Sequence, residues 1–430
     1  MREEQAQAAG RAGKGTVTKD RWAFGFLVAF AVAVYTVPAA WIAGLESARP
    51  ALVTSGLAAA FFFLRRLGKA EPIFLDGARG IPLLAFVALS YLSAQWSVAP
   101  EVSRTTGAEL VKLAAIYLMI VNVVTTPKRL AIFCGALVLS SSVASVGVIQ
   151  WYLNGEDLSE GYRGRWFGVY ADPNHMAMDI GMVVPIAAAF VGRRENHMLL
   201  RIASAIAMGL AVTAVVVSHS RGGFIGLSLG MVLWALREAR RMQSIAVAAA
   251  FILGLMLFAP SSFWERNETV TSFEDDVSAM GRVYAWEVAA GISSDHPLVG
   301  VGSGAFRQAW PLYAPPEAHR AFVAHNVFLD VVSEVGWVGL VLFLLFVAGA
   351  VGGVFAASAD PHVGWLARGL AAATVLYLVC DLFSGYILSA HFYLLFALAA
   401  AAQRVASPVP ALEPAAPLRD RGVLPQGGVA

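Results

Sequence analysis

Arginines stand at the ends of several apolar segments, beside glycine and aromatic residues. Arg221 directly follows an apolar stretch within Ser-Arg-Gly-Gly at positions 220–223, and Arg163 and Arg165 precede a Trp-Phe-Gly turn. Arg282 lies on an amphipathic segment. A guanidinium group donates two parallel hydrogen bonds to phosphate oxygens, and the start of a helix adds backbone N–H donors. One such arginine alone is more often a loop anchor, but the set predicts a site for phosphate or pyrophosphate.

A histidine in the same kind of position is the candidate for proton transfer. His325, followed by Asn326, lies near the point where a long hydrophilic loop meets the next apolar segment. A neutral imidazole is the natural general base for a sugar hydroxyl, and the asparagine could orient it or a substrate. His219 and His175 are rivals on the same face. His391 lies within the last apolar segment, where a role in the core is expected.

Other motifs favour ordinary structural roles, and we expect no metal and no cofactor. The sequence has no HExxH or CxxC motif, and the acidic run at 274–276 is typical of a solvated loop. Cys134 and Cys380 lie inside apolar runs and are expected to pack as small hydrophobic residues. The glycines at 300–304 lack a surrounding βαβ unit, so they predict a loop turn. Asp172, which precedes a proline, predicts a helix N-cap.

Composition shows what kind of fold must position these residues. The chain has 430 residues, of which 58% are hydrophobic and only 14% charged, whereas a soluble domain carries about 25% charged residues. Such a chain cannot cover a soluble surface. The net charge of +2, spread over short loops, gives no reason to expect a nucleic-acid partner. The sequence therefore predicts an all-α polytopic membrane protein.

Apolar segments of the length needed to cross a bilayer, about 20 residues, indicate about twelve transmembrane helices. The predicted spans are 22–44, 51–66, 80–97, 107–124, 129–153, 174–192, 198–218, 222–236, 243–260, 335–356, 363–384 and 388–404. Within the long hydrophilic loop, short helices are expected at 277–292 and 318–332.

The distribution of basic residues predicts the sidedness of these spans. If the N-terminus is cytoplasmic, one face carries 21 of the 31 lysines and arginines, as the positive-inside rule requires. Both termini are then cytoplasmic. The predicted organisation is a tail at 1–21, nine helices within 22–260 with an outer loop at 154–173, a large outer loop at 261–334, three helices within 335–404, and a disordered tail at 405–430.

Several short motifs resemble the O-antigen ligase and polymerase superfamily of membrane glycosyltransferases, both in their order along the chain and in their common position on the outer face of the membrane. They cover about 163–340. The matching segments are Arg165–Gly168, Asp172–His175, Ser220–Gly223, Gly281-Arg282 with Trp286, His296–Phe306, and His325-Asn326 with Leu329 and Gly336–Leu340.

The resemblance implies a metal-independent, inverting enzyme of the C-type glycosyltransferase class in the bacterial inner membrane. Its donor would be an undecaprenyl-diphosphate-linked glycan, used on the periplasmic face. For a ligase, the acceptor would be the lipid A–core oligosaccharide. Matched by motif, Arg221 and Arg282 would hold the donor diphosphate and His325 would be the base; the match is less secure for Arg163, Arg165 and Asn326.

Three alternatives stay open. An O-antigen polymerase would use two polyprenyl-linked substrates, and a protein O-oligosaccharyltransferase would use a pilin-like acceptor. A transporter of an anionic lipid would place ionisable residues near the middle of its spans. The transporter ranks last, because the ionisable residues near the membrane interior form no obvious relay for protons or ions. These residues are Glu109, Lys112, Asp179, Asp330, Glu334 and Asp381.

Overall fold

The computed structural model describes residues 20–45, 47–238, 242, 245–246, 249, 252–254 and 277–406. These residues form helices and loops, with no β-strand among them. Seven helices are long and apolar enough to cross a membrane, namely 50–69, 100–123, 127–154, 173–192, 198–217, 327–357 and 364–384. Shorter apolar helices lie at 21–36, 80–95 and 390–406. The predicted fold class, an all-α polytopic membrane protein, is confirmed.

The first half of the chain forms a run of helices joined by short loops. They are α2 (Arg21–Thr36), α3 (Pro38–Trp41), α4 (Pro50–Lys69), α5 (Gly80–Leu92), α6 (Pro100–Val123), α7 (Pro127–Asn154), α8 (Pro173–Gly181), α9 (Val183–Gly192), α10 (Met198–Val217) and α11 (Arg221–Arg237). α8 and α9 follow each other almost without a break, so together they occupy the predicted span 174–192.

The second half contributes five helices within the part that the structure describes. They are α14 (Val277–Asp295), α15 (Phe306–Tyr313), α16 (Val327–Ala357), α17 (Gly364–Ser384) and α18 (Ala390–Ala406). Helices therefore lie at eleven of the twelve predicted spans. Most of the remaining span, 243–260, lies outside the described residues, as do the acidic run at 274–276 and nearly all of both predicted tails.

Two of the sequence expectations differ from the structure. The first span is shorter than predicted, because Val37 takes a left-handed φ of 43° before Pro38 and ends α2 at Thr36. The expected helix at 318–332 is wrong, since residues 318–326 are not helical. The carbonyl oxygen of the Asn326 side chain accepts hydrogen bonds from the backbone N–H groups of Phe328 and Leu329, so the helix begins only there.

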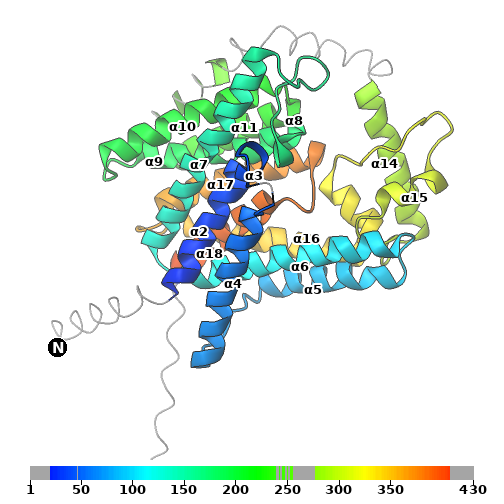
Figure 1. The fold of residues 1–430 in the computed structure, drawn as a ribbon, viewed down its shortest axis with the longest axis horizontal. Coiled ribbons are helices and arrows are strands. Elements are labelled where there is room, and N and C mark those ends of the chain that lie inside the picture. The colour runs from blue at the N-terminus through cyan, green and yellow to red at the C-terminus, as the bar shows by residue number, and fades with distance from the viewer. Residues whose placement is uncertain are drawn as a thin grey trace, which may run out of the picture.

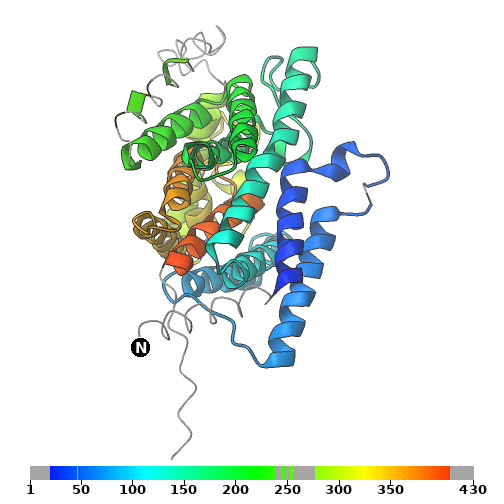
Figure 2. The same ribbon diagram turned by 90° about the vertical axis from the view of Figure 1, so that its left-hand side faces the viewer.

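Most buried apolar side chains belong to one core shared by the membrane helices. Around it, α2 and α4 pack together on one flank, and α5 and α6 lie beside α16 (Figures 1 and 2). α11 packs closely against α17, where glycines replace side chains. A Cβ at Gly226 would lie 2.7 Å from the Cys380 sulfur, and one at Gly230 would lie 3.0 Å from the Ala372 carbonyl oxygen.

α14, α15 and the loop before α16 form a separate region with its own small core, which we call the outer region (residues 277–326). Its buried side chains include Val288, Ile292, Phe306 and Trp310. α14 and α15 lie to one side of the bundle in Figure 1. These buried side chains form a local cluster against the start of α16.

A kink in α16 fastens the outer region to the bundle. Gly336 has a φ of 71° and leaves no space for a side chain, since its Cβ would lie 2.2 Å from the Leu298 carbonyl. The backbone N–H of Gly304 donates a 2.6 Å hydrogen bond to the Glu334 carboxylate, and that of Gly302 donates to the Glu334 carbonyl oxygen at 2.9 Å. The glycine run at 300–304 is therefore the loop turn that the sequence predicts.

Candidate active site

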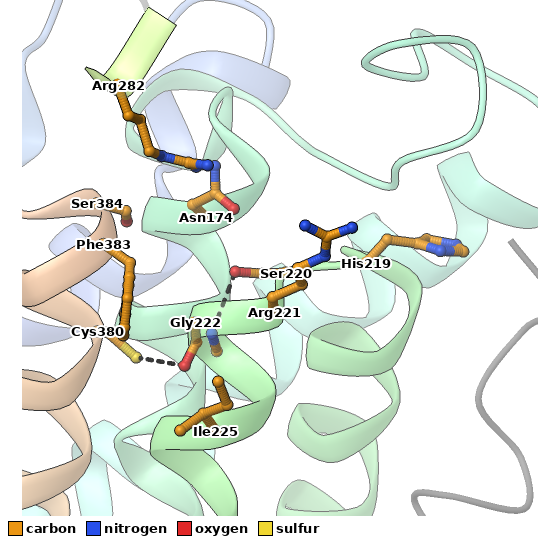
Figure 3. Close-up of a pocket in the computed structure, with 11 residues that line it drawn as sticks. Asn174, His219, Ser220, Arg221, Gly222, Ile225, Arg282, Cys380, Phe383 and Ser384 are labelled. Carbon is orange, nitrogen blue, oxygen red and sulfur yellow. Dashed lines mark hydrogen bonds between the residues drawn. The ribbon is translucent and has the colours of Figure 1, made fainter. Parts of the chain in front are cut away.

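Two of the predicted arginines line one cavity of about 240 Å³. Arg221 comes from the start of α11 and Arg282 from α14, so the cavity, which we call the arginine cavity, lies between the bundle and the outer region. Its other lining residues include Asn174, Ser220, Ile225 and Phe383. Figure 3 shows the Arg282 side chain pointing toward Asn174 from the side opposite to α11.

The position of Arg221 follows from a tight turn between α10 and α11. His219 adopts a left-handed φ of 52°, and the Ser220 hydroxyl accepts a 3.2 Å hydrogen bond from the Gly223 N–H, which caps α11. Because α11 is packed against α17 through its glycines, the first turn of α11 and its positive dipole end are held at the cavity.

The position of Arg282 depends on contacts between α14 and the loop that carries His325. The neighbouring Gly281 lies against Phe322, where a Cβ would come within 2.4 Å of the ring. The Trp286 indole N–H donates a 3.1 Å hydrogen bond to the carbonyl oxygen of Ala324. Arg282 and His325 are thus placed by the same pair of contacts, on two segments more than 40 residues apart.

Arg163 is buried, with 4% of its surface exposed, and it joins two walls of the arginine cavity. Its guanidinium donates hydrogen bonds of 3.0 Å to the Ser218 carbonyl oxygen and 2.7 Å to the Asn174 side-chain oxygen. A third hydrogen bond, also 3.0 Å, goes to Glu160. These contacts give Arg163 a positioning role behind Asn174, whereas the sequence predicted that it contacts phosphate directly.

Arg165 lies apart from the arginine cavity. Its guanidinium forms an ion pair with the Asp157 carboxylate and donates a 2.7 Å hydrogen bond to the Asp157 carbonyl oxygen. Both groups belong to the loop between α7 and α8. Among the arginines predicted to bind phosphate, this one has the contacts of a loop anchor.

His325 lies in the loop directly before α16, half-buried and with a left-handed φ of 49°. Burial lowers the pKa of its imidazole to about 4, and the nearby positive charge of Arg282 adds to this effect, while Asp172 opposes it. At neutral pH the ring is therefore uncharged and able to accept a proton. The structure thus brings His325 close enough to Arg282 for their charges to interact.

Asn326 has two structural contacts. Besides capping α16, its side-chain amide donates a 3.3 Å hydrogen bond to the Leu382 carbonyl oxygen at the end of α17. It therefore ties the His325 loop to the helix that forms one wall of the arginine cavity. The predicted orienting role is compatible with this placement, although its contacts are to the backbone.

The two rival histidines lie in different surroundings. His219 is buried between Tyr152 and Tyr162, at ring-centroid distances of 6.0 and 5.2 Å, and its ring points away from Arg282 in Figure 3. His175 lies after the Asp172 cap, in the first turn of α8, and stacks on Tyr386 at 5.7 Å. The predicted N-cap role of Asp172 is confirmed, since its carboxylate accepts from the N–H groups of Asn174 and His175.

Sequence analysis missed two features. Asn174 lines the arginine cavity and Trp286 holds the His325 loop, although both stand in the motifs quoted for the family. It also missed a buried network in which His391 Nδ1 lies 3.2 Å from the Asp179 carboxylate and His391 Nε2 lies 3.2 Å from the Tyr170 hydroxyl. Only the fold brings α8 and α18 together, so no spacing in the sequence could have indicated this pair.

Acidic, histidine and cysteine side chains do not gather into a metal site in the part of the chain that the structure describes. Both cysteines are buried and free of disulfide bonds, as predicted for residues that pack as small hydrophobic side chains. The charged groups around the arginine cavity are cations, which suit an anionic ligand rather than a metal ion.

Comparison with known proteins gives two findings. The family model of the O-antigen ligase, Wzy_C, matches residues 205–344, a range that contains Arg221, Arg282 and His325. Exopolysaccharide production protein ExoQ of Rhizobium meliloti (strain 1021) is 27% identical over 285 residues, which cover 61% of this chain and 62% of that protein. The match thus spans about three fifths of the relative's length. The resemblance indicated by the motifs is confirmed: residues 205–344 match the Wzy_C O-antigen ligase model, and both comparisons support a likeness to the O-antigen ligase-type superfamily.

Proposed function

We propose that this multi-pass membrane protein is an O-antigen ligase, a glycosyltransferase that moves a glycan from undecaprenyl diphosphate to a hydroxyl of the lipid A–core oligosaccharide. The observation that carries the proposal is the arginine cavity. Arg221 and Arg282, from segments 60 residues apart, line the same space, and His325 lies near enough to Arg282 for their charges to interact. The Wzy_C match supports a membrane glycosyltransferase-like function.

The chemistry follows from the charge that develops on the leaving group. As the bond between the sugar and the diphosphate breaks, negative charge grows on the phosphate oxygen. Arg221, Arg282 and the positive end of α11 stabilise that charge, which is the role a metal ion has in other transferases. Polyprenyl diphosphate is already an activated leaving group, so the reaction needs no nucleotide.

His325 is the proposed base. It accepts the proton of the acceptor hydroxyl while that oxygen attacks the anomeric carbon from the face opposite to the diphosphate, which inverts the configuration. The low pKa makes the ring a weak base. A bound diphosphate places negative charge beside Arg282, which offsets its effect and favours protonation of His325. Donor binding would therefore increase the basicity of the group that activates the acceptor.

Gene deletion followed by analysis of lipopolysaccharide tests the ligase function. Loss of a ligase leaves bare core and accumulated lipid-linked polymer, whereas loss of a polymerase leaves core that carries a single repeat unit. Transfer by the purified chain from lipid-linked glycan to core lipopolysaccharide would establish the activity directly. The absence of transfer in this purified system would contradict the proposal.

A polymerase is the second candidate, because the similar protein is named for exopolysaccharide production. For a polymerase the arginine cavity and His325 keep the same roles, and the acceptor becomes a second polyprenyl-linked glycan. In the purified system, the acceptor that is elongated distinguishes the two activities.

The proposed location is the inner membrane, with both termini cytoplasmic and the arginine cavity periplasmic. The asymmetric distribution of basic residues supports it. Glu156 and His362 are exposed and lie in loops predicted on opposite faces. In cells whose outer membrane has been opened, an impermeant thiol reagent should label Glu156→Cys and not His362→Cys. The reverse pattern would contradict the sidedness.

A further inference from the structure

A second cavity, of about 440 Å³, lies on the other side of the α8 N-terminus. Its walls are the residues before and within the first turns of α8, the loop between α17 and α18, and the start of α18. Asp172 and His175 line it, whereas their neighbour Asn174 lines the arginine cavity. The two cavities are therefore separated by little more than one helix turn.

We propose that this second cavity, which we call the carboxylate cavity, binds the sugar ring of the acceptor glycan. The inference rests on the proposed function and adds to it a site for the second substrate. The polar side chains that line the cavity carry two carboxylates, two imidazoles and two hydroxyls, from Asp172, Asp179, His175, His391, Ser389 and Tyr386. No lysine or arginine is among its described lining residues.

Charge distinguishes this ligand from a diphosphate. Burial opposes ionisation of Asp172, but its electrostatic interactions with His175 and the guanidinium of Arg163, and hydrogen bonds from the N–H groups of His175 and Asn174, outweigh it and hold its pKa below the ordinary value. Asp172 is therefore ionised at neutral pH and repels a phosphate. A carboxylate accepts hydrogen bonds strongly, so it favours a neutral ligand rich in hydroxyl groups.

The wall of the cavity is rigid enough to orient such a ligand. Asp179 and His391 pair at 3.2 Å, and the Asp179 carboxylate also accepts a 2.8 Å hydrogen bond from the Tyr377 hydroxyl. The Tyr170 hydroxyl lies 3.2 Å from His391 Nε2 and 3.1 Å from the Tyr35 carbonyl oxygen. A network whose members satisfy one another fixes side-chain positions, and this is what recognition of a particular hydroxyl needs.

An aromatic surface stands at the same cavity. Tyr386 has 49% of its surface exposed, and its ring stacks on His175 with 24° between the planes. The C–H face of a pyranose packs well on such a flat ring, because it is the apolar side of an otherwise polar ligand. Polar contacts from the wall and one apolar face from Tyr386 together match a sugar better than they match an ion or an acyl chain.

Electrostatic interactions link His325 to both cavities, although it is not among the described residues that line either one. Arg282 of the arginine cavity and His175 of the carboxylate cavity lower its pKa, and Asp172 of the carboxylate cavity raises it. A sugar in the carboxylate cavity would present a hydroxyl toward the base, while the donor diphosphate lies beside Arg221 and Arg282. This arrangement lets the two substrates approach from different directions, as inversion requires.

Steady-state kinetics of the purified full-length chain in lipid nanodiscs test the proposal. The donor is the source organism's lipid-linked glycan, and two arms use its core lipopolysaccharide or its lipid-linked repeat unit as acceptor. Tyr386→Ala should raise the KM for the acceptor about fivefold, the loss expected for one aromatic contact, with the donor KM unchanged within twofold. Tyr386→Phe should retain the wild-type KM because the ring remains.

A second variant fills the carboxylate cavity without removing a contact. Ala171 lines it and is exposed, so Ala171→Trp should obstruct the acceptor and leave donor binding intact. Tyr91→Ala is the matched control for Tyr386→Ala, since this tyrosine has 45% of its surface exposed and does not line the cavity.

The outcomes distinguish a wrong acceptor site from a wrong proposed function. If the wild-type chain transfers glycan but both variants leave the acceptor KM within twofold, or raise the donor KM instead, the acceptor site is elsewhere and the proposed function stands. If the wild-type chain transfers glycan to neither acceptor, the proposed function fails and the inference fails with it.

Discussion

The two cavities beside α8 differ in charge as well as in size. The arginine cavity is lined by two guanidinium groups and the first turn of α11, whereas the carboxylate cavity is lined by two carboxylates and two imidazoles. One helix start serves both, with Asn174 on one side and Asp172 with His175 on the other. In the proposed function, this difference separates an anionic lipid headgroup from a neutral sugar over about one helix turn, because neighbouring side chains alternate in charge.

Replacement of His325, the proposed base, should have the largest effect on the reaction. His325→Ala should reduce transfer by at least about a hundredfold, since general base catalysis is typically worth 10²–10⁴-fold. Donor binding should persist, because the arginines contact the diphosphate independently. Transfer measured alongside donor binding checks this. If the variant keeps activity within a few-fold of wild type, or loses donor binding, His325 is not the base and His219 becomes the next candidate.

Changes in the arginine cavity should affect the donor alone. Arg221→Lys and Arg282→Lys keep the charge but lose the two-pronged hydrogen bond, so each should lower transfer about tenfold to a hundredfold at unchanged protein levels. Arg165→Lys is the control, because Arg165 pairs with Asp157 outside the cavity. Near-wild-type transfer by both cavity variants, or an equal loss in the control, would remove the contrast between the two cavities.

The pH dependence tests the placement of His325 between opposite charges. Its pKa of about 4 predicts that kcat/KM stays level from about pH 7.5 to 5.5 and falls only near pH 4, where the imidazolium forms. Arg282→Gln removes a positive neighbour, so the pKa should rise and the fall should move to higher pH. A wild-type midpoint near pH 6.5, or no shift in the residual activity of Arg282→Gln, would contradict this electrostatic assignment.

Chelation should have the smallest effect. Cations of the protein itself stabilise the leaving group in the proposed mechanism, so transfer by the purified chain should be unchanged in EDTA. The control is transfer after Mg²⁺ or Mn²⁺ is added back. Loss of activity in EDTA with recovery on metal addition would show that the arginine cavity needs a metal ion.

The fold class and the membership of the arginine cavity were largely predictable from the sequence. In a bilayer, long apolar segments form helices because their backbone N–H and C=O groups must pair within the segment. Arginine beside glycine at a helix start is a local pattern that indicates an anion site. Arg221 and Arg282 accordingly lie in one cavity. The roles of Arg163 and Arg165 were not predictable, because a buried hydrogen bond to Asn174 and an ion pair with Asp157 are both invisible in a linear pattern.

The carboxylate cavity shows more clearly what could not be predicted from the sequence. Asp179 and His391 are separated by more than 200 residues, and each alone looks like a polar residue misplaced in an apolar helix. The false helix at 318–332 has a similar cause. Apolar periodicity continues through that segment, but the Asn326 cap and the left-handed His325 start the helix later than periodicity predicts.

The fastening of the outer region at Glu334 and Gly336 has a thermodynamic consequence. Arg221 is fixed to the bundle through α11 and α17, whereas Arg282 is carried by α14, which packs in the small core of the outer region. A diphosphate bound by both would span the boundary between the two cores. By linkage, such a ligand stabilises the docked arrangement as much as docking favours the ligand. Donor affinity and the local stability of the outer region are then two measurements of a single free energy.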